Sequence, residues 1–233
     1  MKMEREPGVR QGAFFDLERT ITADAVEQVA SLAMWRRGDV STSQVLRVLW
    51  CYLRYNLGLI ADFEQLKAQG ACVFEDREPG RDARLLEELY GDRLQSAIFP
   101  EARRLIEEAQ AAGMHLAIVS STYRFMVEPY ARDLGIEDLY GCELEVVDGR
   151  CTGALQGPIY HQEAKATCVR ALATQHDLSL EHSYAFGDSM NDLPMLEAVG
   201  RPVVVNPGAK LGAHARGSGW TRVSWPRPPA PRS

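Results

Sequence analysis

The residues of this sequence that are best suited to chemistry stand directly after short apolar runs. In the stretch AFFDLERT the apolar run ends at Asp16, and Glu18 and Thr20 follow at alternate positions. A second run, HLAIVSS, ends in the hydroxyls of Ser120 and Ser121. In an open α/β sheet, ligands bind beyond the carboxyl ends of the strands. If these runs form neighbouring parallel strands, their terminal side chains converge on one edge of the sheet.

A third run adds acids to the same predicted edge. HSYAFGD ends at Asp188, and Asn191 and Asp192 follow shortly after it. Clustered carboxylates repel one another unless a cation lies among them. Hard oxygen ligands suit Mg²⁺, which typically takes one or two carboxylates together with waters and phosphate oxygens. With Lys165 available to neutralise charge, these residue types predict a Mg²⁺-dependent phosphoryl-transfer site.

The elements that would position these residues are alternating strands and helices. Four apolar runs are continuous rather than alternating, as expected for strands that are buried on both faces. They lie at residues 12–16, 115–121, 182–188 and 201–206. Helical patterns separate several of them, at residues 100–113, 124–135 and 163–176. This alternation predicts an α/β fold with a doubly wound, mostly parallel, Rossmann-like sheet.

Two segments depart from the alternation. Residues 142–157 alternate in polarity around Asp148-Gly149 and predict a small β-hairpin beside the main sheet. From Ile21 to about Pro100 only helical pattern is found. It is interrupted at Gly38, Gly58, Gly70 and Pro79-Gly80. The long helical insertion predicts a separate bundle.

These patterns predict three kinds of region. Residues 12–20 and 100–225 form a Rossmann-like catalytic core, and residues 21–99 form an α-helical bundle cap domain. The polar or proline-rich ends, residues 1–11 and 226–233, are expected to be disordered.

Composition narrows the class of protein and its partners. With 45% apolar and 25% charged residues among 233, the chain resembles an ordinary soluble domain. A net charge of −6 argues against nucleic acid as a partner. The most apolar helix-length run contains Arg47 and Arg54, and it is too short and too charged to span a membrane. Five cysteines without metal-ligand spacing, and no apolar leader, favour reduced thiols in a cytoplasmic protein.

Four short motifs, in a fixed order along the chain, carry a family resemblance. FFDLERT, IVSST, the lysine of HQEAKA and FGDSMNDLPML resemble the four ordered motifs of the haloacid dehalogenase-like superfamily. The resemblance covers about residues 12 to 225 and is closest to the phosphoserine-phosphatase-like branch. In that branch a helical cap lies between motifs one and two. The resemblance implies a phosphatase that acts on a small-molecule phosphomonoester and uses Mg²⁺.

The resemblance also implies a role for each matching residue. Asp16 matches the nucleophile that becomes an aspartyl phosphate, and it is also a metal ligand. Glu18 matches the general acid/base, and its backbone carbonyl matches a second metal ligand. Asp188 matches the metal-ligating acid of the fourth motif. Lys165 matches the lysine that neutralises the charge of the nucleophile and the phosphoryl group.

The remaining matches support the site. Ser120 and Ser121 match the phosphate-binding positions of the second motif. Thr20 is expected to hold the loop after the nucleophile, and Asn191 and Asp192 are expected to order the metal surroundings and the lysine. Taken alone, each of these residues is equally compatible with a turn or a helix cap.

The acid at position 18 is the main departure from the family pattern, which usually has Asp there. Glu18 keeps the carboxylate but lengthens the side chain by one methylene. A displacement of ~1 Å can cost ~100-fold in rate. The longer side chain therefore leaves two hypotheses open. Water accepts the phosphoryl group, as in a phosphatase, or a different acceptor takes it, as in a phosphotransferase.

The substrate-specifying positions also depart from phosphoserine phosphatases. The position nine residues after the nucleophile, where those enzymes carry a glutamate, is Ala25, with Glu27 nearby. The predicted cap carries several aromatic residues: Trp35, Trp50, Tyr52 and Tyr55. They form the core of the bundle, or they line an apolar pocket in which Arg47 or Arg54 meets an acidic group of a larger phosphomonoester.

Two other function classes fit the sequence less well. A receiver-type signalling switch also places an aspartate, a hydroxyl and a lysine at a parallel-sheet edge. The helical insertion and the acids of GDSMND argue against it. A non-catalytic binding protein on the same fold would be expected to lack Asp16, Lys165 or Asp188, and all three are present.

Overall fold

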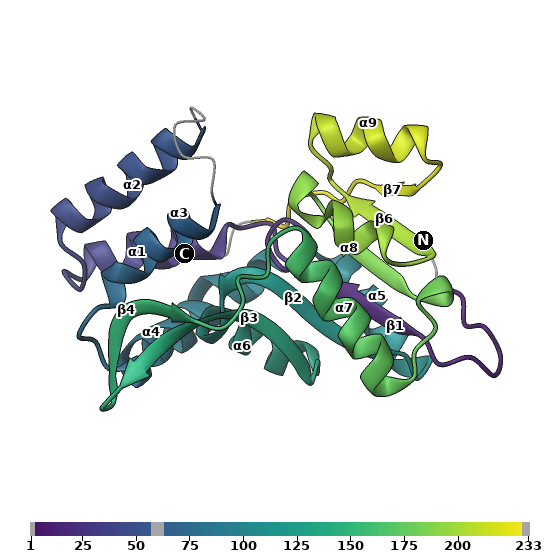
Figure 1. Ribbon diagram of the computed structural model, residues 1–233, viewed down its shortest axis with the longest axis horizontal. Helices are drawn as coiled ribbons and strands as arrows, with labels where there is room; N and C mark the ends of the chain where they lie inside the picture. Colours follow the sequence, from purple (N-terminus) through teal and green to yellow (C-terminus); the bar gives the residue numbers. More distant parts are fainter. Residues whose placement is uncertain (1–2, 57–62, 230–233) are drawn as a thin grey trace.

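A seven-stranded sheet, counted over residues 3–56 and 63–229 that the structure describes, is the centre of this computed structural model (Figure 1). The strand order is β4-β3-β2-β1-β5-β6-β7. The strands are β1 (Gly12–Phe15), β2 (His115–Tyr123), β3 (Asp138–Val147), β4 (Arg150–Gln156), β5 (Tyr184–Gly187), β6 (Arg201–Val205) and β7 (Thr221–Val223). Every neighbouring pair is parallel except β3 and β4. The predicted α/β class with a mostly parallel sheet is confirmed.

Along the described chain, the α-helices lie between the first strand, β1, and the last strand, β7. Those in the described part of the chain are α1 (Val26–Arg36), α2 (Thr42–Asn56), α3 (Phe63–Ala71), α4 (Pro79–Leu89), α5 (Pro100–Ala111), α6 (Arg124–Leu134), α7 (Glu163–His176), α8 (Leu193–Glu197) and α9 (Ala209–Gly217). Among them, none combines the length and the apolar character needed to cross a membrane.

The sheet is buried on both faces, which explains its continuous apolar runs. In β1, Ala13 and Phe15 belong to the core on one face, whereas Phe14 belongs to the core on the other. The first core includes residues of α5 and α6, and the second includes residues of α7, α8 and α9. Neither face of β1 meets water, so neither needs polar residues until the strand ends.

The helices α1 to α4 lie between β1 and α5 in the chain and form a lobe beside the sheet (Figure 1). The chain enters and leaves this lobe at one place, because Thr22 bridges to Glu18 on one side and to Ile98 on the other. Of the interruptions expected from the sequence, Gly38 follows α1 and Pro79 begins α4. Gly70 lies inside α3, which ends one residue later, and Gly58 is outside the described residues.

The hairpin begins earlier than the sequence pattern predicts and is not separate from the main sheet. β3 starts at Asp138, and its first residues pair in parallel with β2 before its later residues pair with β4. The turn is at Asp148-Gly149 as expected, with both residues at positive φ. Cys151 in β4 exchanges backbone hydrogen bonds with Asp76 and Arg77, so the hairpin also supports the helical lobe.

Some residues in the described parts of both chain ends contact the fold. Met3 is buried, and the N–H of Glu4 donates to Tyr184 Oη at 2.8 Å. Gln11 Nε2 donates to the carbonyl of His182 at 2.8 Å. At the other end, the guanidinium of Arg227 pairs with Asp24.

The two tryptophans of the lobe do not lie in its core. Trp35 and Trp50 are exposed, at 42% and 59%. They lie among further exposed apolar side chains, which are Leu32, Leu46, Leu49 and Leu53. The side chains of Tyr52 and Tyr55 are outside the described part. The apolar core of the lobe instead uses Met34, Leu86 and Leu94.

Candidate active site

Asp16 is the first residue after β1 and is buried, with 7% of its surface exposed. Its N–H donates to the carbonyl of Phe186 at 3.0 Å, which fixes it against β5. Phe15 is opposite Ile118 of β2 and Phe186 of β5. By that register, Ser120 and Asp188 each stand one residue beyond the level of Asp16. The strand ends therefore bring the three predicted segments together.

Lys165 joins two of the acids. Its Nζ donates to Asp16 Oδ1 and to Asp192 Oδ1, at 2.6 Å each. The lysine lies in the first turn of α7 and is 2% exposed. Burial lowers the pKa of Lys165, but the charges of Asp16 and Asp192 more than offset burial and raise it. The ammonium is therefore a permanent positive charge beside Asp16.

Asp192 is the hub that orders the fourth motif. Its Oδ2 accepts hydrogen bonds from the N–H of Asp188 at 3.2 Å and from both the N–H and the hydroxyl of Ser189. Gly187 makes room for this arrangement, because a Cβ there would lie 2.5 Å from Cβ of Asp192. The carboxylate thus acts as a capping residue and as a partner of Lys165 at once.

Asp16, Asp188 and Asp192 offer carboxylate oxygens that all lie within 4.8 Å of one another. We call these strand ends the carboxylate edge. Burial, with the charges of neighbouring acids, raises the pKa of Asp188 to about 8. Burial also raises the pKa of Asp16 to about 6, although Lys165 opposes the shift. Three acids share one lysine, so the edge has an excess of negative charge, and its hard oxygen donors fit Mg²⁺.

Glu18 lies between the carboxylate edge and the helical lobe. Its Oε1 accepts from the N–H of Glu27 at 3.2 Å, in the first turn of α1, and from Thr122 Oγ1 at 3.4 Å. Ala25, the residue before α1, has no side chain to cap the helix, so Glu18 supplies that acceptor. Burial, followed by the charge of Glu27, raises the pKa of Glu18 to about 7.

A charged pair from the lobe approaches Glu18, and the sequence reasoning missed it. Lys67 of α3 forms an ion pair with Glu27 of α1, and both influence the pKa of Glu18. Lys67 Nζ also lies over the ring of Tyr123, 4.8 Å from its centroid. Lys67 is 4% exposed. A signal existed: the chain has four lysines, and Lys67 is the one within the helical insertion.

The other predicted residues lie around these groups. Ser120 is buried, and its Oγ accepts from the N–H of Thr122 at 3.2 Å. Ser121 is half-buried, and its carbonyl accepts from the thiol of Cys142. Thr20 is fully buried, and the N–H of Asn191 donates to Ser189 Oγ.

Arg47, which was expected to meet an acidic group of the substrate, has a partner within the lobe. The guanidinium of Arg47 contacts Sγ of Cys72, within the lobe. All five cysteines are free thiols, as the sequence predicts, and four of them are buried.

Comparison with known proteins identifies the family to which the chain belongs. A family model described as haloacid dehalogenase-like hydrolase matches residues 13–197, which include every predicted site residue. The chain belongs to the haloacid dehalogenase-like hydrolases. It is a phosphatase of this superfamily, with phosphoserine-phosphatase-like relatives.

The individual relatives span most of the chain. A probable phosphatase of Mycobacterium tuberculosis is 34% identical over 95% of this chain and 78% of the relative. A phosphoserine phosphatase of the same organism is 30% identical over 93% of this chain and 72% of its own length. A solved protein of unknown function from Bordetella pertussis Tohama I has a TM-score of 0.83 at 30% identity, covering 92% of this chain and 98% of that one.

Proposed function

We propose that this haloacid dehalogenase-like phosphatase is a Mg²⁺-dependent phosphomonoesterase that forms an aspartyl phosphate on Asp16. Its substrate would be a small phosphorylated metabolite. The observation that carries the proposal is the buried set at the carboxylate edge, in which Lys165 holds Asp16 and Asp192 and Asp188 stands alongside. A buried acid with a fixed lysine beside it suits nucleophilic attack on a phosphoryl group.

In the first step a carboxylate oxygen of Asp16 bonds to phosphorus as the bond from phosphorus to the substrate oxygen breaks. Glu18 gives its proton to that leaving oxygen. A pKa near 7 suits this role, because at neutral pH the group is protonated in part and can both give and take a proton. In the second step the Glu18 carboxylate takes a proton from water. The water oxygen then bonds to phosphorus, and the bond to Asp16 breaks.

Lys165 and Ser120 stabilise the phosphoryl group during both steps in this proposal. The ammonium of Lys165, 2.6 Å from Asp16, offsets charge on the nucleophile and on the transferring oxygens. Asp16, Asp188 and the backbone carbonyl of Glu18 would hold the Mg²⁺ ion. When bound, the ion would supply neutralisation of the acids and of the substrate phosphate. Asp192 keeps Lys165 in place.

The charges from the lobe define what a substrate meets beyond its phosphate. Glu27 and Lys67 form an ion pair with each other, and the charges of both act on Glu18. A substrate with an ammonium or a carboxylate near its phosphate can pair with one of them. Phosphoserine has both groups, so it belongs in any substrate panel beside histidinol phosphate and a sugar phosphate.

The proposal is tested by release of inorganic phosphate from this panel and from p-nitrophenyl phosphate, in Mg²⁺ and in EDTA. We expect Mg²⁺-dependent turnover and a phosphoryl group on the peptide that contains Asp16, which hydroxylamine and alkali remove as expected for an acyl phosphate. Asp16→Asn should lower kcat by at least ~10⁴-fold. Asp177→Asn is the matched control, because Asp177 is an exposed acid at the far end of α7.

Single-turnover experiments in ¹⁸O-labelled water decide between hydrolysis and transfer. Incorporation of one labelled oxygen into the released phosphate, at the rate of kcat, supports the phosphatase. Accumulation of a phosphoenzyme that decays only after an alcohol or another acceptor is added identifies a phosphotransferase instead. Activity that is unaffected by EDTA or by Asp16→Asn contradicts the mechanism as a whole.

A further inference from the structure

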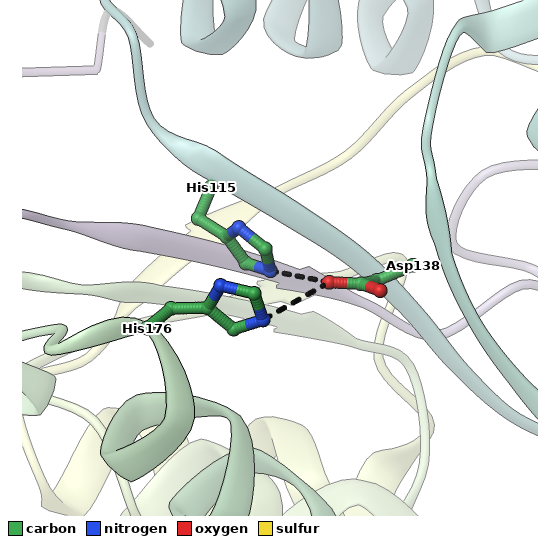
Figure 2. A group of neighbouring side chains, drawn as sticks. All are labelled: His115, Asp138 and His176. Carbon is green, nitrogen blue, oxygen red and sulfur yellow. Dashed lines mark ion pairs between the residues drawn. The ribbon is translucent and has the colours of Figure 1, made fainter.

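Two histidines and an aspartate meet at the end of the sheet opposite the carboxylate edge (Figure 2). His115 is the first residue of β2, Asp138 is the first residue of β3, and His176 is the last residue of α7. One ligand atom from each lies within 4.8 Å of the others. We call this group the histidine site. The proposed phosphatase mechanism uses none of its members.

Both imidazoles present the same ring nitrogen to the same oxygen. His115 Nε2 lies 2.6 Å from Asp138 Oδ2, and His176 Nε2 lies 3.6 Å from it (Figure 2). Within the described residues, neither Nε2 has a hydrogen-bond partner of acceptable geometry, although both atoms are buried from solvent. Buried polar atoms without such partners are uncommon and require an explanation.

A metal ion explains the arrangement better than a salt bridge does. Metal–nitrogen and metal–oxygen bonds of about 2.0–2.2 Å place tetrahedral ligand atoms ~3.3 Å apart. The separation of 3.6 Å from His176 Nε2 to Asp138 Oδ2 is close to this value, whereas the 2.6 Å from His115 Nε2 must lengthen when an ion binds. The two rings are stacked at 3.9 Å between centroids, so protonating both would place two positive charges in contact. Two neutral imidazoles that share one carboxylate are a ligand set for a divalent metal.

We propose that the histidine site binds a borderline divalent transition metal of the Zn²⁺ class through the two Nε2 atoms and Asp138. Imidazole nitrogen favours this class over Mg²⁺, which prefers oxygen. Water molecules complete the coordination. The ion fastens the end of α7 to the starts of β2 and β3. Because α7 also carries Lys165, about 17 Å away along the helix axis at ~1.5 Å per residue, the ion would anchor a helix that positions the proposed catalytic lysine.

The test must separate this site from the carboxylate edge, which can also bind Zn²⁺. We therefore use the full-length chain without an affinity tag, in an Asp188→Asn background, and measure Zn²⁺ binding by calorimetry after EDTA treatment. The expected result is one Zn²⁺ per chain, with an excess of Mg²⁺ failing to compete. Asp138→Asn and His115→Ala should each weaken Zn²⁺ binding by ~100-fold or more. Loss of a residue that only hydrogen-bonds to a metal ligand can cost as little as ~10-fold.

His176→Phe is the decisive variant. It keeps an aromatic ring to stack on His115 but has no ligand nitrogen. We expect its melting temperature in EDTA to equal that of the background protein, and its Zn²⁺-induced rise to disappear. Equal Zn²⁺ binding by the background and by His176→Phe overturns the proposal. Failure of the background protein to bind Zn²⁺ also overturns the proposal. Either result would mean that His115, Asp138 and His176 form only a salt bridge with stacked rings.

Discussion

The two ends of the central sheet carry polar clusters of opposite character. The carboxylate edge combines three acids with one lysine, all close to fully buried except Asp188. The histidine site combines one acid with two imidazoles and is half-buried. Oxygen donors with excess negative charge suit a hard cation, whereas nitrogen donors suit a borderline one. The two proposed sites would therefore differ in metal preference, and α7 contributes a residue to each.

The two clusters also differ in their proposed roles: the carboxylate edge carries out the reaction, and the histidine site stabilises the fold. At the carboxylate edge every charged group faces a neighbour that reacts or holds a reacting group in the proposed mechanism. At the histidine site the three side chains contact one another, and none of them takes part in the proposed mechanism. Changes at the first end should therefore alter rates, and changes at the second should alter metal affinity and stability.

The largest effect that sharpens this contrast is expected from Glu18→Gln. Removing the proton donor should slow the proposed reaction by ~10³–10⁴-fold for alkyl phosphates, whose leaving oxygen needs a proton. For p-nitrophenyl phosphate, whose leaving group departs without protonation, the loss in the first step should be much smaller. Presteady-state measurement of p-nitrophenol release, compared with phosphate release from an alkyl phosphate, checks the difference.

Glu27→Gln is the matched variant for Glu18→Gln. It removes the carboxylate of Glu27 but keeps the backbone N–H of that residue, which donates to Glu18. If both substrates lose the same factor in Glu18→Gln, the residue is not the proton donor. Glu18 would then be a structural cap of α1.

Most of the carboxylate edge could be predicted from sequence, and the histidine site could not. Asp16, Ser120 and Asp188 each follow an apolar run, and a parallel sheet brings such ends together by topology alone. His115, Asp138 and His176 are isolated in sequence and begin or end their elements. Their meeting depends on which strands are neighbours and on where α7 stops. Lys67 was missed for a similar reason, since the direction of α3 over Glu18 is a matter of packing.

Lys165→Met tests how far the buried ammonium offsets the acids of the carboxylate edge. Loss of the ammonium should reduce kcat by ~10²–10³-fold, as for other groups that stabilise transition-state charge. It also leaves Asp16 and Asp192 without their partner, which should destabilise the fold by about 3 kcal/mol at pH 7. Mg²⁺ should recover part of the stability but not the rate. Urea unfolding and steady-state assays measure both effects.

Lys210→Met is the control for Lys165→Met, because Lys210 is exposed in α9. Equal stability of Lys165→Met and wild type, with or without Mg²⁺, would mean that the ion pairs of Lys165 with Asp16 and Asp192 do not stabilise the fold.

A crossed metal titration tests whether the two ends are distinct sites. At about 100 times its dissociation constant, a bound ion stabilises the folded state by ~2.7 kcal/mol. This corresponds to a rise in melting temperature of about 5–10 °C for a chain of this size. Mg²⁺ should give the rise in wild type and His176→Phe but not in Asp188→Asn. Loss of the Mg²⁺ response in His176→Phe would show that the two ends are coupled rather than separate.

The smallest effect is expected at Asp133. There, hydrogen-bond donors as well as burial determine the pKa of the acid. Burial raises the pKa of Asp133, but hydrogen bonds from Tyr90 Oη at 2.7 Å and Arg103 Nη2 at 2.5 Å outweigh it and lower the pKa. A lowered pKa contributes stability above the ordinary value of 3.8, and this stability is lost as the pH falls through the folded-state value. Asp133→Asn should therefore cost about 1–2 kcal/mol at pH 7.

The difference in unfolding free energy between wild type and Asp133→Asn should shrink below about pH 4, as wild-type Asp133 takes up its proton. Urea unfolding at pH 7, 5 and 3 measures this difference. Asp177→Asn, at an exposed acid, should show no such trend. A difference that is constant over this range would mean that the shape of the Asp133 side chain matters and its charge does not.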